Sequence, residues 1–275
     1  MVRAGEPSRT AYGAARLRAL HQDLDDGQIF HDPLAWRILG DAVDAGDADL
    51  ARRERLRVFV AVRHRFAEDS LARAVERGTR QVVVLGAGLD TFAYRNPHLD
   101  TRVIEVDLPA TGEWKRHRLA EAGIEVPHGV AFVGVDFETD DLLERLIAGG
   151  LDAGSPAFFL WLGVVPYLSR AAVAETLRAI ASVPGGEVVL DHTHPIDRAA
   201  AATRPDRVEL RARVADVGEP FSEGLSTEDL HALLGELGFD EIEDLGRREI
   251  RSRYLGLPPG DEDGDTHVVR ALRSR

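Results

Sequence analysis

Short apolar runs that alternate with helical segments constrain the fold of this 275-residue chain more than any other feature. The runs are Gln81–Leu85, Arg102–Val106, Val130–Val135, Ala157–Leu162 and Glu187–Leu190. Strands this uniformly apolar are buried on both faces, as in a parallel sheet that is covered by helices on either side. The pattern therefore predicts an α/β fold built on a doubly wound, mostly parallel sheet.

The N-terminal part of the chain has a helical pattern without such runs. Ser8 or Thr10 can cap a first helix that continues to about His21, and Arg52–Val75 has the pattern of a long, Arg-rich amphipathic helix. We therefore expect residues 1–78 to form a helical cover and residues 79–275 to form the domain that contains the sheet.

The C-terminal part is expected to extend this sheet. Ser169 is a good N-cap for a helix over Ser169–Ser182, and a further helix is expected from Ser226 to about Leu237. Two strands, Asp240–Leu245 and His267–Leu272, follow with a loop between them. Because these last strands are close in the sequence, we expect them to pair antiparallel.

Charge and composition exclude several classes of function. The chain has 34 basic and 47 acidic residues, a formal charge of −13, which repels nucleic acid and anionic membranes, so neither is an expected partner. It has no cysteine, hence no disulfide and no thiolate metal site. Since neither a signal peptide nor a membrane-spanning run is visible, we expect a cytoplasmic protein.

The residues at the strand ends carry the chemistry, because ligands bind at the carboxyl ends of the strands in such sheets. The first run is followed by Gly86-Ala87-Gly88, which permits a tight turn and close approach of a ligand. Thr91 stands where a dinucleotide fingerprint has a third Gly or Ala, which disfavours NAD and an oxidoreductase.

Acids and aromatics follow the next runs. Glu105 and Asp107 lie 19 and 21 residues after Gly86, where a carboxylate is placed to hold ribose hydroxyls. Asp136-Phe137 suits an adenine, and the run that ends at Leu162 is followed by Gly163 and Tyr167. Together these strand ends predict a nucleoside pocket.

The nucleoside is not expected to be a triphosphate, because no Gly-Lys-Ser/Thr phosphate cradle is present and Lys115 is the only lysine. S-adenosylmethionine fits better, since it needs no such cradle. Its amino-acid carboxylate needs a cation, which the Arg-rich helix can supply.

The chain resembles the leucine carboxyl methyltransferase family and its bacterial branch of O-methyltransferases, which often act in natural-product pathways. Motif I of that family is similar to Gln81–Thr91, and Ile104–Pro109 with Lys115-Arg116 and Ile29–Ala35 match further motifs. The bacterial branch also has counterparts of Thr10-Ala11 and Trp161–Leu168. The resemblance covers nearly the whole chain and implies an S-adenosylmethionine-dependent methyltransferase with a Rossmann-like core and an N-terminal helical lid.

Carried over position by position, the resemblance implies roles for individual residues. Arg63 holds the methionine carboxylate, Asp107 rather than Glu105 holds the ribose, and Asp136 and Phe137 meet the adenine. The full cofactor-binding set is Arg63, Gly86, Ala87, Gly88, Asp107, Leu108, Asp136, Phe137 and Leu162. Arg63 and Tyr167 are the expected catalytic residues, since either can orient an acceptor.

The family's enzymes that methylate a phosphatase tail have a glutamate where this chain has Leu162. The difference favours a small-molecule acceptor, most simply a carboxylate, which is ionised at neutral pH and needs no general base. A phenol or enol would need a base, for which His64, His192 and His194 are candidates. A binding protein that methylates nothing remains an alternative.

Two further expectations concern the surroundings of the site. The N-terminal helices are expected to cover it, with Tyr12 and Trp36 as possible acceptor contacts. The pair His192-x-His194 can chelate a metal ion, but no further ligand cluster accompanies it in the sequence, so no metal is expected.

Overall fold

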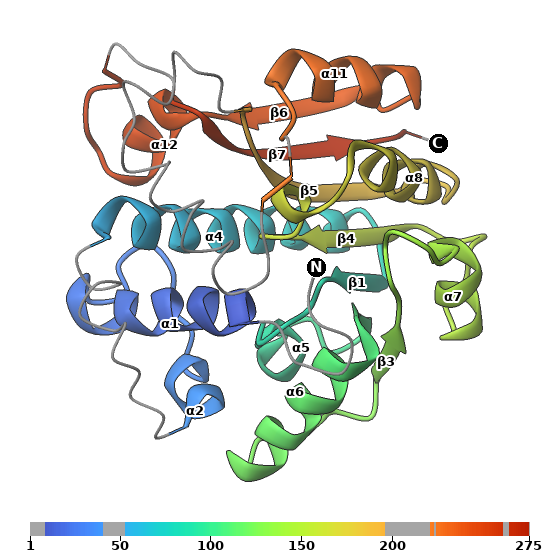
Figure 1. Ribbon diagram of the computed structural model, residues 1–275, viewed down its shortest axis with the longest axis horizontal. Helices are drawn as coiled ribbons and strands as arrows, with labels where there is room; N and C mark the ends of the chain where they lie inside the picture. The colour runs from blue at the N-terminus through green and yellow to red at the C-terminus, as the bar shows by residue number, and fades with distance from the viewer. Residues whose placement is uncertain (1–8, 41–52, 196–220, 223, 261–263, 275) are drawn as a thin grey trace.

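A computed structural model of the chain describes residues 9–40, 53–195, 221–222, 224–260 and 264–274. These residues contain a seven-stranded sheet in the order β3-β2-β1-β4-β5-β7-β6 (Figure 1). The strands are β1 (Gln81–Leu85), β2 (Arg102–Asp107), β3 (Val130–Gly134), β4 (Ala157–Trp161), β5 (Glu187–Thr193), β6 (Glu241–Leu245) and β7 (Thr266–Leu272). The predicted α/β fold is confirmed.

The direction of the strands also agrees with the prediction. Strands β1 to β5 pair in parallel, and β7 runs antiparallel between β5 and β6. The chain leaves β1 toward β2 and β3 on one side and later returns to β4 on the other. The order reverses at β1 and β4, and such a reversal opens a crevice at the carboxyl ends of the strands, where ligands bind.

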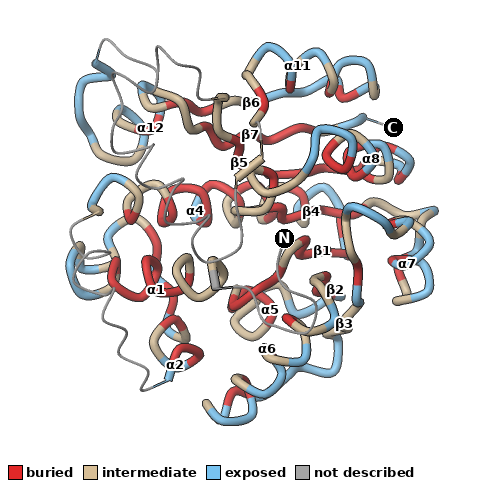
Figure 2. The backbone as a smooth tube through the Cα atoms, in the orientation of Figure 1, coloured by how far each residue is buried: buried red, intermediate tan, exposed pale blue. Residues whose placement is uncertain are grey.

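Helices cover both faces of the sheet. They are α1 (Arg9–Leu24), α2 (Ala35–Leu39), α4 (Glu54–Glu76), α5 (Phe92–Arg95), α6 (Pro109–Glu121), α7 (Leu142–Ala148), the 3₁₀ helix η1 (Val165–Tyr167), α8 (Arg170–Ala181), α11 (Thr227–Glu236) and α12 (Arg247–Tyr254). One face, with Val83 and Phe159, packs on α7, α8 and α11, and the other, with Val82 and Phe158, packs on α4, α5 and α12. Figure 2 shows the central strands buried between these layers.

Helix α4 was expected in the N-terminal cover, and the structure packs it on the sheet itself. Its Val62, Phe66 and Leu71 lie in the same buried cluster as Val84 of β1 and Leu160 of β4. Helix α1 in turn packs on α4, and α2 packs on α1 and α6. The domain boundary at residue 78 remains a prediction.

Two of the predicted N-caps are confirmed. The Ser169 hydroxyl accepts a hydrogen bond from the Ala172 N–H and so caps α8, and Ser226 caps α11 in the same way. Thr10, one of the two caps proposed for the first helix, lies inside α1, which begins at Arg9, so it does not cap this helix. The other, Ser8, and the expected start at Arg52 lie outside the described residues.

The predicted loop between the last two strands needs a correction, because it contains helix α12. Of the residues of α12 only Ile250 is buried, so the segment has no apolar stripe that would reveal a helix. Its N-terminus is held locally, since the Glu249 carboxylate accepts a hydrogen bond from the Gly246 N–H.

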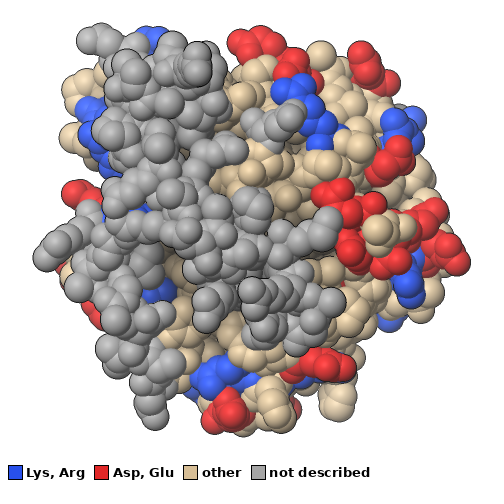
Figure 3. Space-filling model, viewed as in Figure 1, with Lys and Arg blue, Asp and Glu red and all other residues tan. Residues whose placement is uncertain are grey.

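The charge on the surface and the apolar character of the helices are relevant to the partners of the protein. On the face drawn in Figure 3, acidic side chains gather at the right and basic ones are scattered among the described residues. Within the described residues, no helix combines the length and the apolar character that crossing a bilayer requires.

Candidate functional site

The turn after β1 depends on its two glycines. Gly86 and Gly88 have φ of +65° and +39°, in the region that residues with a side chain rarely adopt. A Cβ on Gly86 would lie 2.2 Å from Val164 Cγ2, and one on Gly88 would lie 2.8 Å from Ala11 Cβ. The turn is therefore enclosed by the loop after β4 on one side and by the first turns of α1 on the other.

Asp107, at the end of β2, faces this turn. Its carboxylate accepts hydrogen bonds from the backbone N–H of Gly88, at 2.6 Å, and of Leu108, at 2.8 Å. Burial raises the pKa of Asp107, while these two hydrogen bonds oppose the shift. Because a carboxylate can accept about four hydrogen bonds, Asp107 retains acceptor capacity for a ligand.

Glu105, the other candidate at this strand end, is occupied by protein groups. Its carboxylate forms a buried ion pair with Lys115 Nζ at 2.8 Å and accepts a hydrogen bond from the Tyr94 hydroxyl at 2.7 Å. The only lysine of the chain thus has a structural partner at the edge of the site.

A pocket of about 140 Å³ lies at the carboxyl ends of β1, β2 and β3. It brings together four predicted cofactor-binding residues, Ala87, Gly88, Asp107 and Leu108. Its other lining residues are Glu105, Pro109, Gly112, Glu113, Lys115, Arg116, Phe132, Val133 and Gly134. Phe132 was not predicted from the sequence, because it lies inside an apolar run where nothing marks the residues that face the crevice.

Asp136 and Phe137 are among the predicted cofactor-binding residues that do not line this pocket. Asp136 and Phe137 lie in the turn after β3, where Asp136 Oδ1 accepts a hydrogen bond from the Glu138 N–H at 3.0 Å. Phe137 is half-buried against the core between the sheet and helices α7 and α8. Their contact with an adenine stays a prediction.

Arg63 of α4 reaches the carboxyl ends of β4 and β5. Its Nη1 forms a buried ion pair with Asp191 Oδ2 at 3.1 Å, and Asp191 Oδ1 accepts a hydrogen bond from the Gly163 N–H at 2.5 Å. Gly163 has φ +73°, and a Cβ there would lie 2.8 Å from Arg63 Nη2. Arg63 Nε is buried without a hydrogen-bond partner among the described residues.

The role of Asp191 was not predicted. From the sequence, the residues that follow Asp191 are candidates only for bases or metal ligands. No local signal connects it to Arg63, which is 128 positions away in the chain.

The other predicted residues lie around this centre. Leu162 packs, half-buried, against the core beneath α4. The ring of Tyr167, in η1, lies 5.0 Å from that of Phe221. Tyr12 and Trp36 pack on the cluster between α1, α2 and α6, so their expected contact with an acceptor stays a prediction.

The N-terminal motif is fixed to the turn region through Asp32. This buried carboxylate pairs with Arg18 Nε at 2.9 Å and accepts a hydrogen bond from the Thr91 hydroxyl at 2.7 Å. Arg18 also donates to the Leu89 carbonyl at 2.7 Å. Although burial opposes the shift, Arg18 and Arg95 lower the pKa of Asp32. Asp32 therefore connects α1 to the residues that follow Gly88.

Comparisons with known proteins show the family to which the chain belongs. The profile of the leucine carboxyl methyltransferase family matches residues 11–181. YktD of Bacillus subtilis (strain 168), named provisionally as an S-adenosyl-L-methionine-dependent methyltransferase, is 29% identical, and the match covers 92% of this chain and 93% of YktD. A protein of Mycolicibacterium paratuberculosis with the same provisional name is 31% identical over 96% of this chain and 92% of its own length.

The solved structures support the fold. A DUF574 family protein from Streptomyces avermitilis has a TM-score of 0.58 and 18% identity, with 98% of this chain and 99% of that one covered. At this identity the similarity concerns the fold alone. The motif at the end of β1, the strand order and the family match lead to one conclusion: the chain belongs to the leucine carboxyl methyltransferase family and is an S-adenosylmethionine-dependent methyltransferase.

Proposed function

We propose that this methyltransferase transfers the methyl group of S-adenosylmethionine to a carboxylate oxygen of a small molecule. The observation that carries the proposal is the placement of the candidate bases that another acceptor would need. His64 has both ring nitrogens within hydrogen-bonding distance of acceptors, Nδ1 at 2.7 Å from the Val60 carbonyl and Nε2 at 3.2 Å from Asp90. A base held in this way is poorly placed to take a proton from a phenol or enol.

The two other candidate bases are also held by the protein: His194 lies within hydrogen-bonding distance of a hydroxyl, and His192 is buried. His194 Nε2 lies 2.8 Å from the Thr227 hydroxyl. His192 is fully buried, and it projects to the opposite face of β5 from Asp191, because neighbouring residues of a strand alternate. An acceptor that is already ionised at neutral pH requires none of these histidines.

The candidate site offers polar groups that suit S-adenosylmethionine. Asp107 provides a carboxylate with free acceptor capacity for the ribose hydroxyls, next to backbone that only glycine can form. Glu105 is already bonded to Lys115, which supports the choice of Asp107. Arg63 provides a buried guanidinium for the methionine carboxylate, and Asp191 orients it.

Adenine recognition is assigned to the end of β3. Phe132, Val133 and Gly134 of this strand line the pocket, and Asp136 and Phe137 lie in the turn after it.

The cofactor supplies an electrophilic methyl group, so the protein chiefly provides proximity and alignment. Arg63 fixes one end of the site, and the turn at Gly86 and Gly88 allows close approach of the reactants. Tyr167, at the end of η1, is proposed to orient the acceptor with its hydroxyl. The helices α1 and α4 are proposed to exclude water from the centre.

Transfer of a labelled methyl group tests the acceptor class. The protein is incubated with S-adenosylmethionine labelled in its methyl group and with matched panels of carboxylic acids and phenols. We expect label in the acids, as esters that alkali cleaves. Alkali-stable label in the phenols would overturn the carboxylate proposal, and tight cofactor binding without transfer to any acceptor would favour a non-catalytic binding protein.

A further inference from the structure

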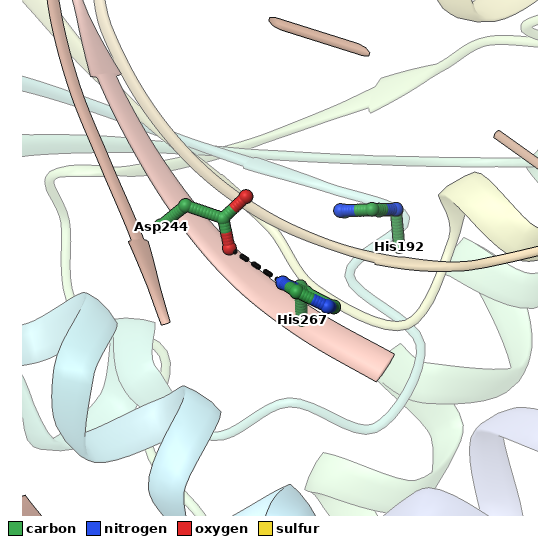
Figure 4. Close-up of side chains that lie close together, drawn as sticks. All are labelled: His192, Asp244 and His267. Atoms are coloured by element: carbon green, nitrogen blue, oxygen red, sulfur yellow. Dashed lines mark hydrogen bonds and ion pairs between the residues drawn. The ribbon is translucent and has the colours of Figure 1, made fainter. Parts of the chain in front are cut away.

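A cluster of histidines around one carboxylate lies at the end of the sheet where β5, β6 and β7 meet. His192 of β5 is the cross-strand partner of His267 of β7, and their rings stack with centroids 5.2 Å apart. His267 Nδ1 lies 2.8 Å from Asp244 Oδ1 of β6. Figure 4 shows the carboxylate and the His267 ring in contact, with the His192 ring across from both.

His192 has the tautomer and the burial of a metal ligand. Its Nδ1 lies 3.2 Å from the Leu225 carbonyl, to which it donates, so Nε2 carries the lone pair. This Nε2 is buried and has no hydrogen-bond partner among the described residues. An imidazole that donates one N–H to a carbonyl and presents its other nitrogen is the usual form of a metal-bound histidine.

The three side chains are close enough to share one ion. One nitrogen or oxygen of each of His192, Asp244 and His267 lies within 4.8 Å of the others. Ligands at about 2.0–2.2 Å from a tetrahedral ion are about 3.4 Å apart. Displacements of the ligand atoms by about an ångström, through small side-chain rotations, therefore suffice to bring all three into contact with one ion. Two imidazoles and one carboxylate suit zinc and its neighbours in the first transition row, whereas magnesium and calcium prefer oxygen ligands alone.

Two further histidines contact the cluster. The His194 ring stacks on those of His192 and His267, at 5.7 Å and 5.1 Å. The second Asp244 oxygen, Oδ2, lies 2.8 Å from His231 Nε2 and is thereby oriented from outside. The sequence shows only His192 and His194 as neighbours, so no metal was expected. The fold adds His267 and Asp244 from the last two strands.

We propose that His192, His267 and Asp244 bind one divalent transition-metal ion, such as zinc, which cross-links strands β5, β6 and β7. The metal site lies on the opposite face of β5 from Asp191, and away from the pocket at the ends of β1, β2 and β3. Its expected effect is on stability, because an ion that binds only the folded chain raises the free energy of unfolding.

Metal titration of the full chain tests this proposal directly. The protein, freed of any purification tag and treated with a chelator, is titrated with Zn²⁺ in a calorimeter and with Co²⁺ in a spectrophotometer. We expect one ion per chain, visible absorption typical of tetrahedral Co²⁺ that Zn²⁺ abolishes and Mg²⁺ does not, and a higher melting temperature with Zn²⁺.

Matched variants locate the site. His192→Gln is expected to weaken Zn²⁺ binding by at least about tenfold and to abolish the rise in melting temperature. Asp244→Asn is expected to act likewise, and it serves if His192→Gln folds poorly, because Asp244 is only half-buried. His128→Gln is the control, since this exposed histidine precedes β3 at the opposite edge of the sheet.

Two results would overturn the proposal. One is wild-type protein that binds no Zn²⁺ or Co²⁺ at this stoichiometry. The other is equal binding by the wild type, His192→Gln and His128→Gln, which would assign the ion to surface groups. Far-UV circular dichroism of each metal-free variant verifies that the fold is retained.

Discussion

At the scale of single residues, the site depends on which acid at the end of β2 is available to a ligand. Glu105 is paired with Lys115, whereas Asp107 accepts hydrogen bonds from two backbone N–H groups. We predict that Asp107→Asn weakens S-adenosylhomocysteine binding by about tenfold or more, through loss of charge-assisted hydrogen bonds to the ribose. Calorimetry measures the affinity. Glu113→Gln removes an exposed acid from the same pocket and should leave the affinity unchanged.

A second residue, Asp32, is predicted to govern stability in acid. Arg18 and Arg95 lower its pKa below 3.8, so its contribution to folding is fully present above pH 3.8 and is lost as the pH falls through the lower, folded-state value. We predict that Asp32→Asn reduces the free energy of unfolding by about 3 kcal/mol at pH 7, since it leaves a buried guanidinium unpaired. Urea denaturation should show this difference shrinking below pH 3.8, and a difference independent of pH would contradict the argument.

At the scale of elements, the strands were predictable because burial on both faces leaves continuous apolar runs. Strand β5 shows the limit of this signal. Its predicted end was Leu190, but the strand continues through Asp191 to Thr193, because buried partners satisfy these polar residues. Helix α12 was missed for the opposite reason, since it has a single buried residue.

The site was predictable where its residues follow a strand directly, as Gly86, Gly88 and Asp107 do. Contacts between distant segments were not predictable from local pattern. The pairing of Arg63 with Asp191 requires α4 to lie on β5 in one register, and only tertiary packing fixes that register. The same holds for His267 and Asp244, which approach His192 through strand pairing.

The connection between β1 and α5 provides an element-scale prediction. Gly86→Ala strains the backbone, because φ is +65° at this position. The added Cβ would also lie 2.2 Å from Val164 Cγ2, so the loop after β4 must move. We predict a lower melting temperature and weaker cofactor binding. Gly123→Ala is the matched control, because φ is +61° there and nothing lies within 4 Å of the added Cβ. It should cost only about 1–2 kcal/mol of stability and no cofactor affinity.

At the scale of the whole molecule, α4 is attached to β5 at both ends of that strand. Arg63 pairs with Asp191 at the carboxyl end, and Arg77, directly after α4, pairs with Glu187 at the start of β5. Arg270 of β7 also pairs with Glu187. One end of this long contact therefore lies at the candidate site, and the other lies at the amino end of β5 and stabilises the fold.

This division predicts different consequences for two similar substitutions on one strand. Glu187→Gln removes the partner of two guanidinium groups and is expected to lower the free energy of unfolding by about 3 kcal/mol while cofactor affinity stays unchanged. Asp191→Asn is expected to weaken cofactor binding at least severalfold, because Arg63 loses the carboxylate that orients it. Denaturation and calorimetry on both variants measure the two effects separately. Loss of cofactor affinity in Glu187→Gln would show that the two ends of α4 are coupled, because the position of Arg63 would then depend on the pairing of Arg77 with Glu187.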